Sequence, residues 1–192
     1  MSHGEHILQD MYGTTRRALA FYDNQMLDHV NEEMQHFIAA QEMMFIATAD
    51  AGGNCDNSFR AGDRGFVRVL DETTLMYPEY RGNGVMASLG NIYENPHISL
   101  LFIDFFTHHI GLHVNGRADI IESDQIHGYC DAKTLSNIME EADGRAERFV
   151  VIRVDEAYIH CSKHIPHLEK RSGPLDQKKS GDFFNARRKN DK

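Results

Sequence analysis

Residues 45–118 hold the feature that most limits the fold, a closely spaced series of short segments rich in β-branched and aromatic residues. Segments 45–50 and 55–60 flank a Gly-containing turn, and segments 66–70 and 74–77 flank a polar one. Each pair predicts a β-hairpin. Because side chains alternate across a strand, each strand can turn one face toward a common core.

A short helix and two further strands complete this series. Residues 85–92 have helical spacing, and we expect the helix to end before Pro96. Segments 98–104 and 110–115 are the fifth and sixth expected strands. Six strands with one helix between the fourth and fifth predict a mainly β fold with flanking helices, built on an antiparallel barrel rather than on βαβ units.

The segments outside this series predict helices and two late strands. Residues 14–20 and 27–41 predict helices that cover one open end of the barrel. Residues 123–140 predict another helix, with its first residue, a serine, as the cap. Apolar segments 148–154 and 157–160 predict further strands.

Length and charge predict one acidic domain followed by a basic tail. A chain of 192 residues with 41% hydrophobic and 26% charged residues suits a single globular core. Residues 169–192 hold eight Lys/Arg and four Asp/Glu, a net charge of +4, so residues 1–168 carry −13 of the overall −9. We expect a single domain over 1–168 and a basic, partly ordered tail over 169–192.

Composition also excludes several classes of protein. The overall net charge of −9 argues against a general nucleic-acid binder. No apolar run approaches the roughly 20 residues that span a bilayer, and the N-terminus has no secretory pattern. Three cysteines without a pairwise motif suit a reducing compartment. These features predict a cytoplasmic protein that does not bind nucleic acid or membranes.

The order and spacing of short motifs resemble the pyridoxamine 5'-phosphate oxidase-like flavin-binding split barrels. Within that family they are most similar to the branch described as FMN-dependent enzymes or flavin-nucleotide-binding proteins. The resemblance covers most of residues 30–165, and it implies a six-stranded antiparallel split β-barrel that binds FMN at a homodimer interface. The motifs are Ala47-Thr-Ala-Asp50, Ser58-Phe-Arg60, Gly65-Phe-Val67, Leu70-Asp71, Gly82-Asn83, Ser88-Leu-Gly-Asn-Ile92, Asn95-Pro96, Leu100-Leu-Phe-Ile-Asp104 and Val114-Asn-Gly-Arg-Ala118.

Two groups of residues are candidates for binding the FMN phosphate. Ser58 and Arg60 lie two apart on a strand and share a face, so they offer a hydroxyl and a cation to one site. An exposed surface pair is the alternative from the residues alone. Arg81, Asn83 and Ser88 belong to a Gly-containing loop and the helix after it, and the resemblance implies that this segment helps to hold the phosphate.

Other residues are candidates for contacts with the flavin ring. The resemblance implies that Tyr77 lines the ring, and a core tyrosine with a solvated hydroxyl is an equally favoured alternative. The resemblance implies that the pyrimidine edge is approached from the partner subunit, a role that by position falls to His113, His160 or Lys163. Residues 85–87 are apolar where related proteins often have a basic residue, which leaves part of the expected positive charge unaccounted for.

The function that the resemblance implies is that of an FMN-binding oxidoreductase acting on a small molecule. Neither substrate nor catalytic residue is identified, and we expect no efficient oxidation of pyridoxamine phosphate, because the C-terminal Arg-and-His signature of that oxidase is not recognisable. The alternative is a non-catalytic split barrel that binds flavin, deazaflavin or haem. His160, Cys161 and His164 have ligand chemistry, but their spacing matches no zinc motif and we expect no metal site.

Overall fold

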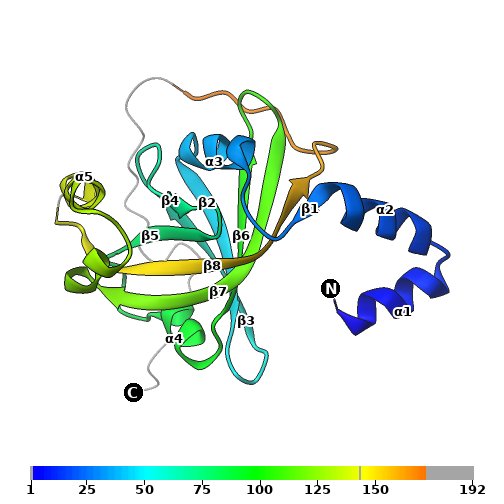
Figure 1. Ribbon diagram of the computed structural model, residues 1–192, viewed down its shortest axis with the longest axis horizontal. Coiled ribbons are helices and arrows are strands. Elements are labelled where there is room, and N and C mark those ends of the chain that lie inside the picture. The colour runs from blue at the N-terminus through cyan, green and yellow to red at the C-terminus, as the bar shows by residue number, and fades with distance from the viewer. Residues whose placement is uncertain (1, 143, 172–192) are drawn as a thin grey trace, which may run out of the picture.

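The computed structural model describes residues 2–142 and 144–171, and its centre is one antiparallel sheet rolled into a split barrel (Figure 1). The strand order is β3-β2-β6-β7-β8-β5-β4, and β1 pairs with β8 beside this path. The strands are β1 (Met26–Leu27), β2 (Met43–Ala49), β3 (Cys55–Ala61), β4 (Arg68–Asp71), β5 (Thr74–Tyr80), β6 (His97–Asp104), β7 (Ile110–Glu122) and β8 (Ala146–His160).

The predicted fold class is confirmed, since the described chain is mainly antiparallel β with flanking helices. The structure describes eight strands, and six of them, β2 to β7, correspond to the six strands expected over residues 45–118. The late segments 148–154 and 157–160 form one strand, β8, because β8 pairs with β7 along nearly its whole length and tolerates a bulge at Asn115/Gly116. The two-residue strand β1 was not predicted.

The barrel interior is filled from alternate positions of the strands. Along β2 every second residue is buried, which places Met44 and Ile46 in the core beside Leu100 and Phe102 of β6. A smaller second cluster, which includes Phe149 and Ile138, lies on the other side of β5 and β8. The alternation therefore fixes which side chains face the interior and which face solvent or a ligand.

The helices are α1 (His3–Met11), α2 (Thr15–Gln25), α3 (Glu32–Ala39), α4 (Ala87–Glu94) and α5 (Ala132–Ala142), with a 3-10 helix η1 (Ser123–Gly128). α3 closes one end of the barrel through the buried side chain of Ile38. Its start at Glu32, later than expected, follows from Asn31, whose side chain accepts a hydrogen bond from the Met34 amide as an N-cap.

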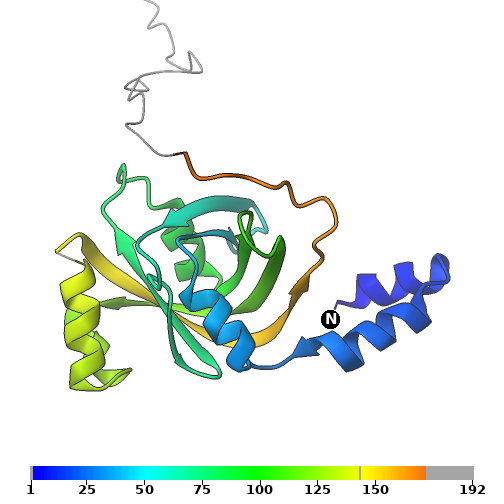
Figure 2. The same ribbon diagram turned by 90° about the horizontal axis from the view of Figure 1, so that it is seen from above.

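The expectation that the first helices cover the barrel end is wrong for α2. α1 and α2 form a hairpin that projects away from the barrel (Figures 1 and 2), and neither contains a buried residue. α1 was not predicted, although Ser2 and Glu5 form the reciprocal capping box that starts it. Phe21 of α2 stays close to the barrel, with its ring 5.8 Å from that of Tyr158 on β8.

The single helix expected over 123–140 is interrupted. η1 ends at Gly128, and Asp131 starts α5 by accepting a hydrogen bond from the Thr134 amide at 2.7 Å. Ser123 is not a cap; instead, Gln125 Oε1 accepts from the Glu122 amide.

Within residues 2–142 and 144–171, no helix combines the length and apolarity that crossing a membrane requires. Most of the predicted basic tail, residues 172–192, lies outside the described residues.

Candidate functional site

A cavity of about 580 Å³ lies where β3, β5, α4 and the start of β8 meet. It brings together five predicted phosphate-binding residues: Ser58, Arg60, Arg81, Asn83 and Ser88. Its other described lining residues are Asp56, Glu79, Tyr80, Gly82, Gly84, Val85, Met86, Ala87, Leu89, Glu147 and Arg148.

The loop before α4 presents open backbone to this cavity. Gly84 has a φ of +82°, a conformation that glycine adopts without cost, and a Cβ placed there or at Gly82 would meet nothing within 4 Å. Asn83 Oδ1 accepts from the Val85 amide and holds the turn. Because the helix that follows directs its positive dipole end at this loop, the arrangement favours an anion.

Arg60 is held by the protein itself. Its Nε and Nη2 donate to the two carboxylate oxygens of Glu79, each at 3.0 Å, and its Nη1 donates to Ser58 Oγ at 2.9 Å and to the Phe59 carbonyl. Both side chains of the ion pair are largely buried, at 18% and 16% exposed. Since β3 and β5 are not neighbours in the sheet, this bidentate pair bridges the split of the barrel.

The two serines of the cavity have different hydrogen-bonding capacity left. Ser58 Oγ accepts from Arg60, so its own hydroxyl proton remains for a ligand. Ser88, which is buried, donates its proton to Asp56 Oδ2 at 2.9 Å. Ser58 is therefore the better hydroxyl donor of the two.

A second group of charges lies at the rim. Glu147 reaches Arg81 Nε at 4.0 Å through one carboxylate oxygen and Arg148 Nη1 at 3.6 Å through the other. Arg148 Nε also lies 3.7 Å from Glu122. Arg81 is 86% exposed, whereas Arg148 is 22% exposed. Among the described lining residues, three guanidinium groups thus face three carboxylates, those of Asp56, Glu79 and Glu147.

Tyr77 is a core residue and does not line the cavity. Its side chain is fully buried, and its hydroxyl has no hydrogen-bond partner among the described residues. Burial raises the pKa of this phenol, with a further increase from Glu79 and an opposing effect of Arg60. Of the two roles predicted for Tyr77, its position in the structure is that of a core tyrosine.

The other predicted residues lie far from this cavity in the same chain. His113 Nε2 and His160 Nδ1 share a hydrogen bond of 2.9 Å, and His113 stacks on Tyr158 with ring centres 4.8 Å apart. Lys163 is exposed after the end of β8, where its amide donates to Cys161 Sγ. Arg148, which lines the cavity, pairs with Glu122 on β7, and Glu122 lies nine residues from His113 on the same strand. Nine residues of a strand span roughly 30 Å, so His113 lies well away from the cavity.

In the part of the chain that the structure describes, no three His, Cys, Asp or Glu side chains come together as a set of metal ligands. His160, Cys161 and His164 therefore do not converge on one point. His160 is instead bonded to His113.

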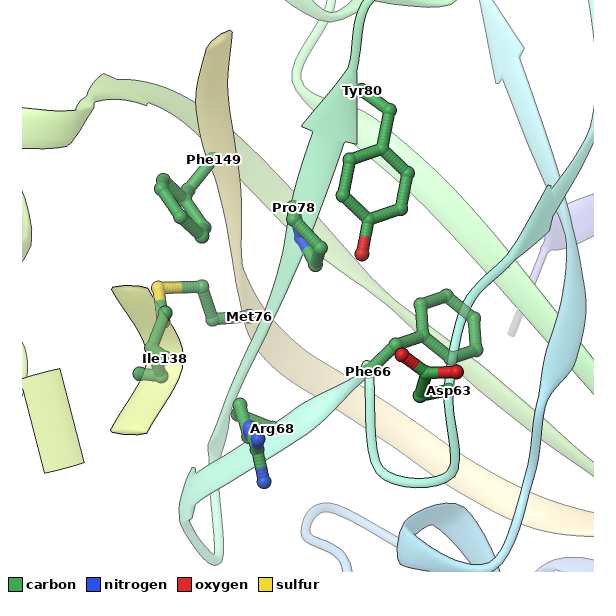
Figure 3. Close-up of a pocket in the computed structure, with 8 residues that line it drawn as sticks. All are labelled: Asp63, Phe66, Arg68, Met76, Pro78, Tyr80, Ile138 and Phe149. Carbon is green, nitrogen blue, oxygen red and sulfur yellow. The ribbon is translucent and has the colours of Figure 1, made fainter. Parts of the chain in front are cut away.

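Two other cavities are not lined by any of the predicted site residues. Figure 3 shows one on the opposite face of β5, with a volume of about 20 Å³, which is room for about one water molecule. Its lining residues are Asp63, Phe66, Arg68, Met76, Pro78, Tyr80, Ile138 and Phe149. The other, of about 520 Å³, lies beside α3, and its lining includes Lys170 and Glu42, which form an ion pair.

Sequence reasoning missed the carboxylates and one cation of the cavity. Glu79 follows Tyr77 by two residues, and this spacing was a signal that it shares the inward face of β5. Arg148 was noted only as the first residue of an expected strand. No local signal joins it to Arg81, because their proximity depends on the pairing of β5 with β8.

Comparisons with known proteins agree with this architecture. The family model for pyridoxamine 5'-phosphate oxidase matches residues 30–161. HupZ from Group A Streptococcus is 20% identical and superposes with a TM-score of 0.51 over 73% of this chain and 99% of its own. A candidate pyridoxamine 5'-phosphate oxidase from Lactobacillus delbrueckii is also 20% identical, with a TM-score of 0.50 over 70% of this chain and 98% of its own. No curated protein matches the chain in sequence.

Proposed function

The chain belongs to the pyridoxamine 5'-phosphate oxidase family, and we propose that it is an FMN-binding flavoprotein that acts as an oxidoreductase on a small molecule. The observation that carries this proposal is the cavity in which the Ser58 hydroxyl, the guanidinium groups of Arg81 and Arg148, an open glycine loop and the start of α4 converge. A phosphate dianion requires this donor chemistry. When bound, FMN would supply two-electron transfer chemistry.

The same cavity has an apolar side that suits a flavin ring. Val85, Met86 and Leu89 line it, and Val85 and Met86 are 70% and 52% exposed. A flat aromatic ring needs apolar surface with polar groups at its edge. The apolar residues 85–87, where related proteins often have a basic residue, would thus contact the ring while Arg81 and Arg148 remain for the phosphate.

A homodimer completes the proposal. His113, His160 and Lys163 lie too far along β7 and β8 to reach the cavity of their own chain. In a homodimer they would approach the flavin of the partner subunit, where an imidazole N–H can hydrogen-bond to the pyrimidine edge. The three cysteines are free, and a cytoplasmic location is consistent with that.

The test is the absorbance spectrum of protein purified without added cofactor. We expect absorption at about 450 nm, release of FMN into the supernatant on denaturation, and sedimentation as a dimer. A Soret band, a deazaflavin in the supernatant, or colourless monomeric protein that ignores added FMN would contradict the proposal.

Turnover separates an enzyme from a binding protein. Flavin-loaded protein should be reduced by a nicotinamide donor or a small-molecule substrate and reoxidised, as followed by bleaching of the flavin band. Pyridoxamine phosphate should be a poor substrate. FMN that is bound but inert toward every donor and acceptor would favour the non-catalytic alternative.

A further inference from the structure

The most exchangeable ion pairs of the cavity are those of Glu147, whose carboxylate lies between Arg81 and Arg148. We propose that Arg148 and Arg81 form the clamp that binds the ligand's phosphate, and that Glu147 is the internal competitor which the phosphate displaces. This inference rests on the proposed function. It assigns a binding role to Arg148 and a specificity-determining role to Glu147, neither of which the sequence motifs indicated.

Arg60, the cation that the motifs favour, has little donor capacity left. Its guanidinium makes four hydrogen bonds within the protein, two of them to Glu79. Releasing it to a phosphate would leave the largely buried Glu79 carboxylate without its partner, at a considerable cost. Arg60 is better described as the group that orients Ser58 and closes the split of the barrel.

The pairing of the strands explains why Arg148 remains available. Glu79 on β5 lies directly opposite Arg148 on β8, yet both carboxylate oxygens of Glu79 accept from Arg60. Arg148 is left with contacts of 3.6 and 3.7 Å to Glu147 and Glu122, which are too long for good hydrogen bonds. The nearby carboxylates therefore balance the charge of Arg148, but its N–H groups do not make good hydrogen bonds to them.

The competing carboxylates are held weakly. The side chains of Glu147 and Glu122 are 42% and 62% exposed, and ion pairs of such exposed groups contribute little to stability. A phosphate bound between Arg81 and Arg148 would replace one carboxylate charge with up to two and would lie in the cavity that the start of α4 lines. The exchange is thus favourable for a dianion and less so for a neutral ligand.

The experiment compares the dissociation constants of FMN and riboflavin, measured by quenching of flavin fluorescence. Riboflavin has the same ring and lacks the phosphate, so the ratio of the two constants reports on the phosphate site. Arg148→Gln should weaken FMN binding by about ten- to hundredfold and leave riboflavin nearly unchanged. Arg148→Lys should recover part of the loss, because it retains the charge but not the planar guanidinium.

Glu147→Gln should change the affinity for FMN in the opposite direction. Removing the competitor should strengthen FMN binding by about two- to fivefold, with no change for riboflavin. Arg153→Gln is the matched control, since Arg153 is an exposed arginine on the same strand that does not line the cavity. It should leave both constants at their wild-type values.

The outcomes separate the two proposals. Wild-type protein that binds neither flavin would overturn the proposed function itself. Wild-type protein that binds FMN, with an FMN-to-riboflavin ratio that Arg148→Gln leaves unchanged, would overturn the clamp alone. A Glu147→Gln variant that binds FMN more weakly would show that Glu147 supports the phosphate site rather than competing for it, and would also refute the inference.

Discussion

The two ends of the long β7–β8 pair carry different chemistry. At the cavity end, Arg148 is surrounded by carboxylates in loose, partly exposed contacts. At the other end, His113 and His160 share a single hydrogen bond beside the ring of Tyr158. The cavity end can exchange one anion for another at little cost, whereas the histidine end depends on a proton lying between two rings.

One strand pair thus carries two kinds of side-chain chemistry at its two ends. At the cavity end, the carboxylates of Glu147 and Glu122 are exposed enough for water to screen them. The imidazole of His113 is half-buried, and this burial, with a smaller contribution from the neighbouring His160, lowers the pKa of His113 below its ordinary value of 6.5.

The largest expected effect comes from a substitution at the bulge that lies between the two ends of the β7–β8 pair. A Cβ at Gly116 would lie 2.1 Å from the Arg153 carbonyl oxygen, so Gly116→Ala must displace backbone in β7 or β8. We expect a loss of about 2–4 kcal/mol in the free energy of unfolding, measured by urea denaturation. Gly90→Ala is the control, because α4 leaves open space at Gly90 and alanine favours a helix. Equal stability of the two variants would contradict this account of the bulge.

The next effect concerns the Arg60–Glu79 pair, which should behave differently from the loose pairs at the rim. Glu79→Ala leaves a largely buried guanidinium without its bidentate partner, and should cost about 2–3 kcal/mol of unfolding free energy. The double variant with Arg60→Ala should cost less than the sum of the two single variants.

The control for this cycle is an exposed ion pair of the same type. Arg117 and Asp155 lie 3.9 Å apart and are 58% and 55% exposed, so Arg117→Ala should cost less than about 1 kcal/mol. Additive costs at Arg60 and Glu79 would mean that the bidentate pair does not couple β3 to β5.

The sequence predicted the barrel better than it predicted the cavity. Alternating burial along β2 and the turn signals between hairpins are local, and they placed β2 and β3 within two residues of their bounds. β7 instead extends seven residues beyond the expected end at residue 115, because β8 pairs with it over that length. The break before Asp131 was missed because a favourable helical pattern continues on both sides of it, and the capping bond at Thr134 decides the outcome.

The cavity could be predicted in part because its residues follow motifs. Ser58, Arg60, Arg81, Asn83 and Ser88 do come together. Which carboxylate each arginine contacts depends on how the strands pair, and no local sequence pattern gives that pairing. Arg60 is nineteen positions from Glu79 along the chain, and Arg148 is far from Arg81, so their contacts exist only in the folded sheet.

At the histidine end we expect stability to depend on pH in the mildly acidic range. The depressed pKa of His113 means that the unfolded chain binds a proton more readily than the folded one. Stability is then complete above pH 6.5, the ordinary value, and is lost as the pH falls from there through the lower folded pKa. His113→Gln, which keeps a polar group beside His160, should flatten the pH profile of urea denaturation in this window. His127→Gln, at an exposed position, controls for the loss of one histidine, and an identical profile in both variants would remove His113 from this role.

The smallest expected effect tests whether the projecting hairpin belongs to the histidine end alone. Phe21 contacts Tyr158 edge to face at 5.8 Å, and Tyr158 in turn stacks on His113. Phe21→Ala should cost about 0.5–1.5 kcal/mol, because one aromatic contact is lost and no buried residue of α2 is disturbed. Since α2 does not line the cavity, the ratio of FMN to riboflavin affinities should stay at the wild-type value. Leu19→Ala, at a position that is 50% exposed on the same helix, provides the control for a shortened apolar side chain. A changed affinity ratio in Phe21→Ala would mean that the two ends of the β7–β8 pair are coupled, and that the hairpin acts on the cavity through the strands that join them.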